Sequence, residues 1–224
     1  MSSSVVGLLL GLLVGLRHAF EPDHLTAVAT FATEARDARK GAVLGAWWGL
    51  GHTVSLVLVG IILIGANAVM PAHIAARFEL GVCAMLIVLG LRAIYRSIKL
   101  GAVGPTHQHT HAGMRHVHAG ASSHLHVGTR VVALRPLMVG LVHGLAGSGA
   151  LTALVFAELP GTSARVAYIA VFGIGSIAGM TIASAIVGVS MRALVRSQRW
   201  LTLTAGIASV VLGVVWSLPL WSLA

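Results

Sequence analysis

Six apolar runs alternate with short polar connectors along the chain. They cover residues Val5–Phe31, Ala42–Val69, Phe78–Ile98, Val131–Ala157, Ala164–Met191 and Trp200–Leu220. A helix of about 20 apolar residues crosses the hydrocarbon core of a bilayer, so each run is long enough to span it. The pattern predicts an all-α polytopic membrane protein with six transmembrane helices.

Composition supports a membrane protein and gives it an orientation. The chain of 224 residues is 57% hydrophobic and only 9% charged, whereas soluble domains carry about 25% charged residues. The formal net charge of +9 comes from basic residues at the ends of the apolar runs, so nucleic acid is not an expected partner and the lipid bilayer is. The basic residues gather in the first, third and fifth connectors, which the positive-inside rule places in the cytoplasm. We therefore expect a multi-pass protein of the cytoplasmic (plasma) membrane with its N- and C-termini outside.

The two halves of the chain resemble each other. Gly15–His18 in the first run corresponds to Gly140–His143 in the fourth, and Trp48–His52 in the second corresponds to Phe172–Ser176 in the fifth. Each half contains three spans, and an odd number forces the halves into opposite orientations. The pattern predicts a 3+3 inverted repeat, a plan that places substrate near the bilayer midplane on discontinuous helices. Its expected parts are transmembrane repeat 1 (residues 1–100), a cytoplasmic loop (101–129) and transmembrane repeat 2 (130–224).

The middle of the first apolar run carries charged residues. Arg17, Glu21 and Asp23 lie within the sequence Arg-His-Ala-Phe-Glu-Pro-Asp-His. Each ionised residue at a helix centre costs about 2.5–3.5 kcal/mol on insertion scales. Such a cost is hard to reconcile with a purely structural helix, so this segment is the first candidate site.

Pro22 gives this segment its expected geometry. It lacks an N–H and clashes with the carbonyl four residues back, so we expect the first helix to be broken near Pro22. A break lets His18, Asp23 and His24 converge on one ion. Neutral imidazoles with a carboxylate suit Ni, Co, Zn or Fe better than Mg or Ca.

Two further histidines lie inside apolar runs. His52 lies between glycines in the second span, and we expect it to be a ligand or pathway residue. His143 occupies the position equivalent to His18 but has no carboxylate nearby in the sequence, so pathway and structural roles stay open for it. Arg17 and Glu21 are also candidate pathway residues.

The loop between the repeats is rich in histidine. We expect it to be disordered without metal and to act as a metal reservoir while its imidazoles are neutral. The residues concerned are His107, His109, His111, His116, His118, His124 and His126.

Two motifs resemble those of the nickel/cobalt transporter family. Its signature is a His, four residues and then Asp-His, preceded by Arg, and Arg17, His18, Asp23 and His24 match it. The aromatic-Gly-His-Thr motif of residues 47–53 is similar to the family's next motif. The resemblance implies that His18, Asp23, His24 and His52 bind or select Ni²⁺ or Co²⁺. The six spans and the sequence His-Gly-Leu-Ala-Gly-Ser-Gly are closer to the six-span urease-accessory, efflux-like branch. Glu21-Pro22 stands where the family has Asp-Ala, which leaves the metal preference open.

These observations predict a membrane permease for Ni²⁺ and/or Co²⁺ that uses a midplane His/Asp site. We expect no enzymatic activity, because no separate acid–base pair accompanies the ligands, and no tightly bound cofactor. Uptake is the favoured direction, and a cytoplasmic metallochaperone is a candidate partner. Two alternatives stay open: an efflux system with the same site, and an accessory protein that delivers nickel to urease or hydrogenase maturation without transport.

Overall fold

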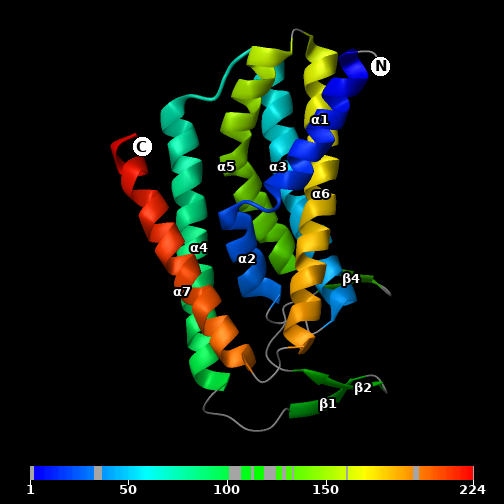
Figure 1. Ribbon diagram of the computed structural model, residues 1–224, viewed down its shortest axis with the longest axis vertical. Coiled ribbons are helices and arrows are strands. Elements are labelled where there is room, and N and C mark those ends of the chain that lie inside the picture. The colour runs from blue at the N-terminus through cyan, green and yellow to red at the C-terminus, as the bar shows by residue number, and fades with distance from the viewer. Residues whose placement is uncertain are drawn as a thin grey trace.

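A bundle of seven α-helices makes up the membrane portion that the structure describes (Figure 1). The computed structural model describes residues 3–32, 37–100, 107–111, 114–118, 125–127, 130–132, 134–159, 161–193 and 197–223. The helices are α1 (Ser3–His18), α2 (Pro22–Ala32), α3 (Ala38–Gly65), α4 (Ala72–Leu100), α5 (Leu134–Glu158), α6 (Thr162–Ala193) and α7 (Gln198–Ser217), which continues into the 3₁₀ helix η2 (Leu218–Ser222).

Four of these elements are long and apolar enough to cross a membrane: α3, α4, α6, and α7 together with η2. Two shorter apolar stretches lie in α1 (Gly7–His18) and α5 (Leu134–Gly147). Many large hydrophobic side chains point outwards from the bundle, as expected for a surface that meets lipid. The chain is therefore a multi-pass helical membrane protein, and the count of six crossings stays a prediction.

The first apolar run forms two helices, as the sequence predicts. The α1 helix ends at His18, and the N–H groups of Phe20 and Glu21 close the turn by donating to the carbonyls of Arg17 and His18. Pro22 is the first residue of α2, a position where the N–H would have no intrahelical partner and proline is tolerated. The break thus places His18 at the end of one helix and the Asp-His pair at the start of the next.

The sequence predicts a loop that is disordered without metal, but the parts of the loop that the structure describes form short strands. Strand β1 (His107–His111) pairs antiparallel with β2 (Met114–His118), and β3 (Leu125–Val127) pairs with β4 (Arg130–Val132). The alternation of histidine with other residues in β1 is the two-residue period of a strand, which a reading based on composition alone overlooks. Residue His124 lies outside the described residues. Strands β1 and β2 lie at the end of the bundle opposite to both chain termini, and β4 lies beside the bundle (Figure 1).

The helix contacts occur in matching pairs. At the centre α3 packs against α6, the two middle spans of the predicted repeats, and α4 packs against α7, the two last spans. The contact of α1 with α6 has its counterpart in that of α5 with α3, and the contact of α2 with α7 has its counterpart in that of α4 with α5. Each of these contacts between a helix of one half and a helix of the other therefore has a counterpart between the equivalent helices, or joins two equivalent helices.

The same correspondence between the halves holds for the glycines that lie in close contact with the backbone of the other half. The Cα of Gly15 lies against the carbonyl of Phe172, and Gly140 lies against the carbonyl of Trp48, so that an added Cβ would overlap either carbonyl. The partners are equivalent residues of the two halves. The same exchange relates Gly51 against Leu137 to Gly175 against Leu12, and Gly90 against Gly206 to Gly213 against Cys83. Glycine thus sets the spacing of the helices that surround the α1–α2 break.

The apolar core lies in two clusters. One joins α2 to its neighbours through Ala27 and Val28 with Leu86 of α4 and Met180 of α6. The other joins α3, α5 and α6 through Leu56, Leu151, Val155, Ile169 and Phe172, together with Ile64. The first cluster therefore packs α2 against α4 and α6 on the C-terminal side of the break.

Candidate metal centre

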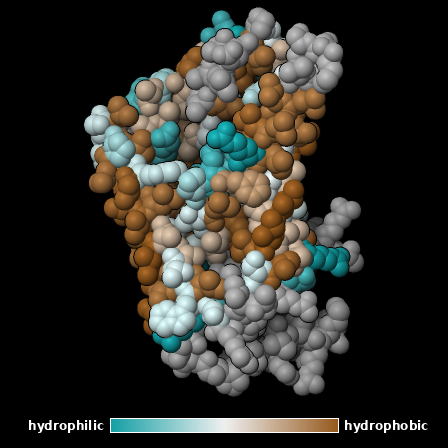
Figure 2. Space-filling view, in the orientation of Figure 1, coloured by the Kyte–Doolittle hydropathy of each residue, from teal (hydrophilic) through white to brown (hydrophobic). Residues whose placement is uncertain are grey.

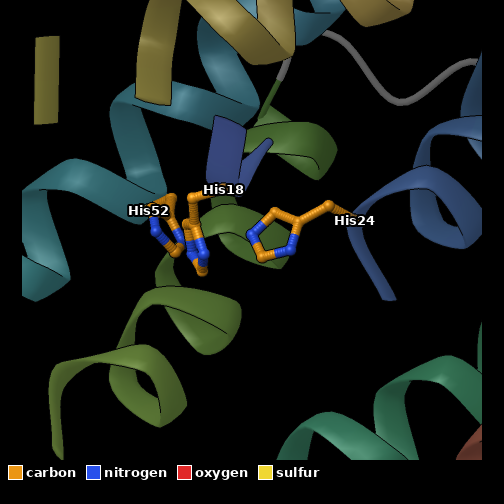
Figure 3. A group of neighbouring side chains, drawn as sticks. All are labelled: His18, His24 and His52. Carbon is orange, nitrogen blue, oxygen red and sulfur yellow. The ribbon is translucent and has the colours of Figure 1, made fainter. Parts of the chain in front are cut away.

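Three histidines from three helices converge beside the α1–α2 break (Figure 3). His18 comes from the end of α1, His24 from the start of α2 and His52 from the middle of α3. One ring nitrogen of each can be chosen so that all lie within 4.8 Å of one another. The ring centroids of His18 and His24 are 4.4 Å apart, and each lies 5.3 Å from that of His52. Because His52 lies halfway along α3, the group lies near half-depth of the span.

A second group shares one histidine with the first. Ligand atoms of Asp23, His24 and His143 also lie within 4.8 Å of one another. The Nε2–H of His143 donates to Oδ2 of Asp23 at 2.7 Å, and Nδ1 of His24 lies 3.1 Å from Oδ1. Asp23 therefore bridges two imidazoles, and His24 belongs to both groups.

The cluster is buried, and several of its nitrogens have no partner. His24, His52 and His143 are at most 2% exposed, and Asp23 is 8% exposed. Among the described residues, the buried histidine nitrogens without a hydrogen-bond partner are Nε2 of His18, Nδ1 of His143 and both ring nitrogens of His24 and of His52. A buried polar group left unsatisfied costs about 1–3 kcal/mol. Several such nitrogens facing one another, with one carboxylate, form a donor set that suits a borderline divalent transition-metal ion.

Glu21 contacts His18 at the exposed edge of the cluster. Its Oε2 lies 3.0 Å from Nδ1 of His18. A histidine that binds metal commonly gives its other ring N–H to a carboxylate, which sets the tautomer and the ring orientation. With Nδ1 facing Glu21, Nε2 of His18 is left as the nitrogen that faces the other histidines.

Two aromatic rings flank the cluster at equivalent positions of the two halves. The ring of Trp48 lies 5.5 Å from that of His24, and the ring of Phe172 lies 5.4 Å from that of His18. Gly147 of α5 also borders the cluster, since an added Cβ would lie 3.8 Å from Nε2 of His18 and from Cε1 of His52. The sequence interpretation assigned no role at the site to these three residues. The match between Trp48-Gly-Leu-Gly and Phe172-Gly-Ile-Gly was the signal that could have found the two rings.

The structure brings together all four predicted ligands, His18, Asp23, His24 and His52, and it adds His143. Glu21 is at the edge of the cluster, whereas the side chain of Arg17 is exposed in the last turn of α1. Strands β1 and β2, which carry five of the loop histidines, lie at the end of the bundle opposite to the termini, away from this cluster at half-depth (Figure 1).

The chain matches known proteins over most of its length. The family model described as NicO, high-affinity nickel-transport protein, matches residues 5–214. The urease accessory protein UreH of Bacillus sp. (strain TB-90) is 30% identical over 182 residues, which are 81% of this chain and 76% of that protein. No solved structure matches the chain significantly. The resemblance seen in the motifs is thereby confirmed, including its urease-accessory branch, and the matched proteins are non-enzymatic transport and accessory proteins. The chain belongs to the NicO family of high-affinity nickel-transport proteins.

Proposed function

We propose that this protein is a permease for Ni²⁺ and/or Co²⁺ and that His18, Asp23, His24 and His52 bind the ion, with His143 as a fifth member of the site. The observation that carries the proposal is the convergence of buried ring nitrogens without protein partners at half-depth of the bundle. Nitrogen donors with one carboxylate disfavour Mg²⁺ and Ca²⁺, which prefer all-oxygen coordination.

The shared histidine supports movement of the ion rather than storage. Conduction requires sites that bind strongly enough to admit an ion and weakly enough to release it. Because His24 belongs to both groups, an ion held by His18, His24 and His52 can pass to Asp23, His24 and His143 while it keeps one ligand. Such a transfer avoids a fully unliganded ion inside the bundle.

The proposed architecture has six spans in a 3+3 inverted repeat, with α1 and α2 together forming the first span. The paired helix contacts and glycine approaches support it, since equivalent residues exchange partners. Both termini lie at one end of the bundle and the histidine-rich loop at the other (Figure 1), and the basic connectors favour the loop end as cytoplasmic. Reporter fusions at Ala224 and near Gly120 should report outside and inside respectively, and a cytoplasmic C-terminus would contradict this orientation.

Uptake is the proposed direction. A membrane potential that is negative inside supplies about 2.3 kcal/mol per elementary charge per 100 mV, hence roughly 5 kcal/mol for a divalent ion. Uptake therefore needs no nucleotide. On the cytoplasmic side, the loop histidines form the proposed reservoir, from which a metallochaperone would collect the ion.

A second candidate is an accessory protein that delivers nickel to enzyme maturation without moving it across the membrane. The name of the Bacillus relative, a urease accessory protein, favours it. An efflux system with the same site is a third candidate, and it differs from uptake only in direction.

The test is radiometal flux in proteoliposomes of defined orientation, with and without an imposed potential, beside equilibrium nickel binding. We expect inward flux in the wild type and its loss in His24→Ala. The matched control is His73→Ala, which removes an exposed histidine outside the site and should leave flux unchanged. Binding without flux would identify an accessory protein, and outward flux alone would identify an efflux system. Absence of both in a folded protein would overturn the proposal.

A further inference from the structure

Charged residues are exposed at half-depth of the bundle, where lipid would surround a typical span. The charged residues Arg17 and Glu21 lie at the α1–α2 break and are exposed, as is Phe20 between them. Figure 2 shows hydrophilic surface near the middle of this face, between apolar surfaces above and below. An ionised side chain that faces lipid at this depth is costly, and such residues almost always face water or protein.

The packing around the break differs between its two ends. The α2 helix packs against α4, α6 and α7, whereas α1 packs chiefly against α6. Consequently the break is covered towards the loop end by α2 and its neighbours. Towards the end that carries the termini, α1 has one chief neighbour, α6, and the break residues Arg17, Phe20 and Glu21 are exposed.

Exposure falls stepwise from the break into the cluster. The side chain of Glu21 is 51% exposed, that of His18 is 16% exposed and that of His24 is 1% exposed. Glu21 contacts His18 directly, and the ring of His18 contacts that of His24. A continuous series of side chains thus joins the surface to the buried nitrogens.

We propose that the α1–α2 break is the water-filled mouth of the metal path, open towards the end that carries both termini, and that Glu21 positions His18 at this mouth. The proposal rests on the proposed function, and it adds where the ion enters the site and which residue prepares its first ligand. Glu21 accepts from Nδ1–H of His18, so that Nε2 keeps its lone pair towards the cluster. The same carboxylate is the first anionic group that a hydrated divalent cation meets.

Thiol labelling tests the mouth, and the chain suits it because Cys83 is its single cysteine. In a Cys83→Ala background, Phe20→Cys should react with a membrane-impermeant maleimide added from the side of the termini, because the reactive thiolate needs water. Ile174→Cys is the matched control, since Ile174 is an exposed apolar residue two positions after Phe172 on α6. We expect it to face lipid and to stay unlabelled. Added Ni²⁺ should slow the labelling of Phe20→Cys.

Three outcomes overturn the mouth: no labelling of Phe20→Cys in a protein that binds Ni²⁺, equal labelling of the control, or labelling only from the loop side. Arg17→Cys serves as the second probe if Phe20→Cys does not fold. Flux that depends on His24 beside an unreactive break would remove the mouth and leave the proposed function intact. Labelling of a protein that shows no flux would remove the function instead.

Paired substitutions test the positioning role of Glu21. Glu21→Ala removes the acceptor for Nδ1–H and should weaken Ni²⁺ binding by about 10–100-fold, the usual effect of losing such an orienting partner. Glu21→Gln keeps a carbonyl oxygen in the same place and should restore most of the affinity. Isothermal titration with NiCl₂ in detergent measures both. Equal losses in the two variants would show that Glu21 acts by charge alone, and unchanged affinity in Glu21→Ala would show no role; either result overturns positioning.

Discussion

Asp23→Asn is the substitution that separates a metal site from a structural polar network most clearly. Asp23 contacts His143 through one oxygen and His24 through the other. Asparagine keeps the size of the side chain and can still hydrogen-bond, but it removes the negative charge. We therefore expect the variant to insert and fold normally, since a neutral residue inserts at lower cost than a charged one, and to lose nickel binding and flux.

The size of the effect follows from the geometry of the cluster. A cation held by Asp23, His24 and His143 lies within about 5 Å of the carboxylate, because the ligand atoms all lie within 4.8 Å of one another. A unit charge and a divalent ion at about 5 Å interact by roughly 7 kcal/mol at an effective dielectric constant of about 20. The amide oxygen and local rearrangement recover part of this energy. We expect a loss of about 100- to 1,000-fold in nickel affinity, which corresponds to roughly 3–4 kcal/mol.

The assay is isothermal titration with NiCl₂ in detergent, beside flux in proteoliposomes and thermal unfolding of the same preparation. Asp37→Asn is the matched control: Asp37 is the N-cap of α3 and accepts from the N–H of Arg39, and asparagine caps helices equally well. It should bind nickel as the wild type does. If folded Asp23→Asn binds nickel within about threefold of the wild type, a difference below 1 kcal/mol, the carboxylate takes no part in binding and the reasoning fails.

Three further predictions concern packing, the second ligand group and the loop. Gly140→Ala should lower stability by about 1–3 kcal/mol in thermal unfolding, because its Cβ overlaps the carbonyl of Trp48, whereas Gly7→Ala, which meets nothing within 4 Å, should change nothing; equal unfolding temperatures would contradict the packing. His143→Ala should weaken nickel binding by about 10–100-fold in titration, because it removes the imidazole that orients the carboxylate of Asp23. An unchanged affinity would show that His143 only packs the helices. Deletion of residues 106–127 should leave flux in place but alter its dependence on nickel concentration, and complete loss of flux would make the loop part of the path.

The break in the first span and the nearness of His18 to His24 were predictable because both depend on local sequence. Pro22 cannot continue a helix that begins before it, and charges at that depth require partners. The five residues between His18 and His24 also limit how far apart the two rings can lie. The structure places their centroids 4.4 Å apart, in agreement with this local reasoning.

The role of His143 was not predictable in the same way. It lies 120 residues from Asp23 along the chain, yet the two side chains form a 2.7 Å contact. That contact depends on the height of α5 against α3 and α2, which is set by close approaches such as Gly140 against Trp48 and Gly144 against His52. The sequence repeat made His143 the equivalent of His18 but did not predict which side chains His143 contacts.

What the sequence determined by itself is the kind of protein and the identity of its donor groups. Hydrophobic runs specify membrane helices because lipid cannot satisfy exposed backbone groups, and a His/Asp motif at half-depth specifies chemistry for a transition metal. What only the tertiary structure decided is which donors share one space and which residues of the break are exposed. Helix register and tilt arise from many small contacts between segments far apart in the chain, and no local pattern encodes them. For that reason His24 could be expected at the site, whereas its membership of two overlapping ligand groups required the packed bundle.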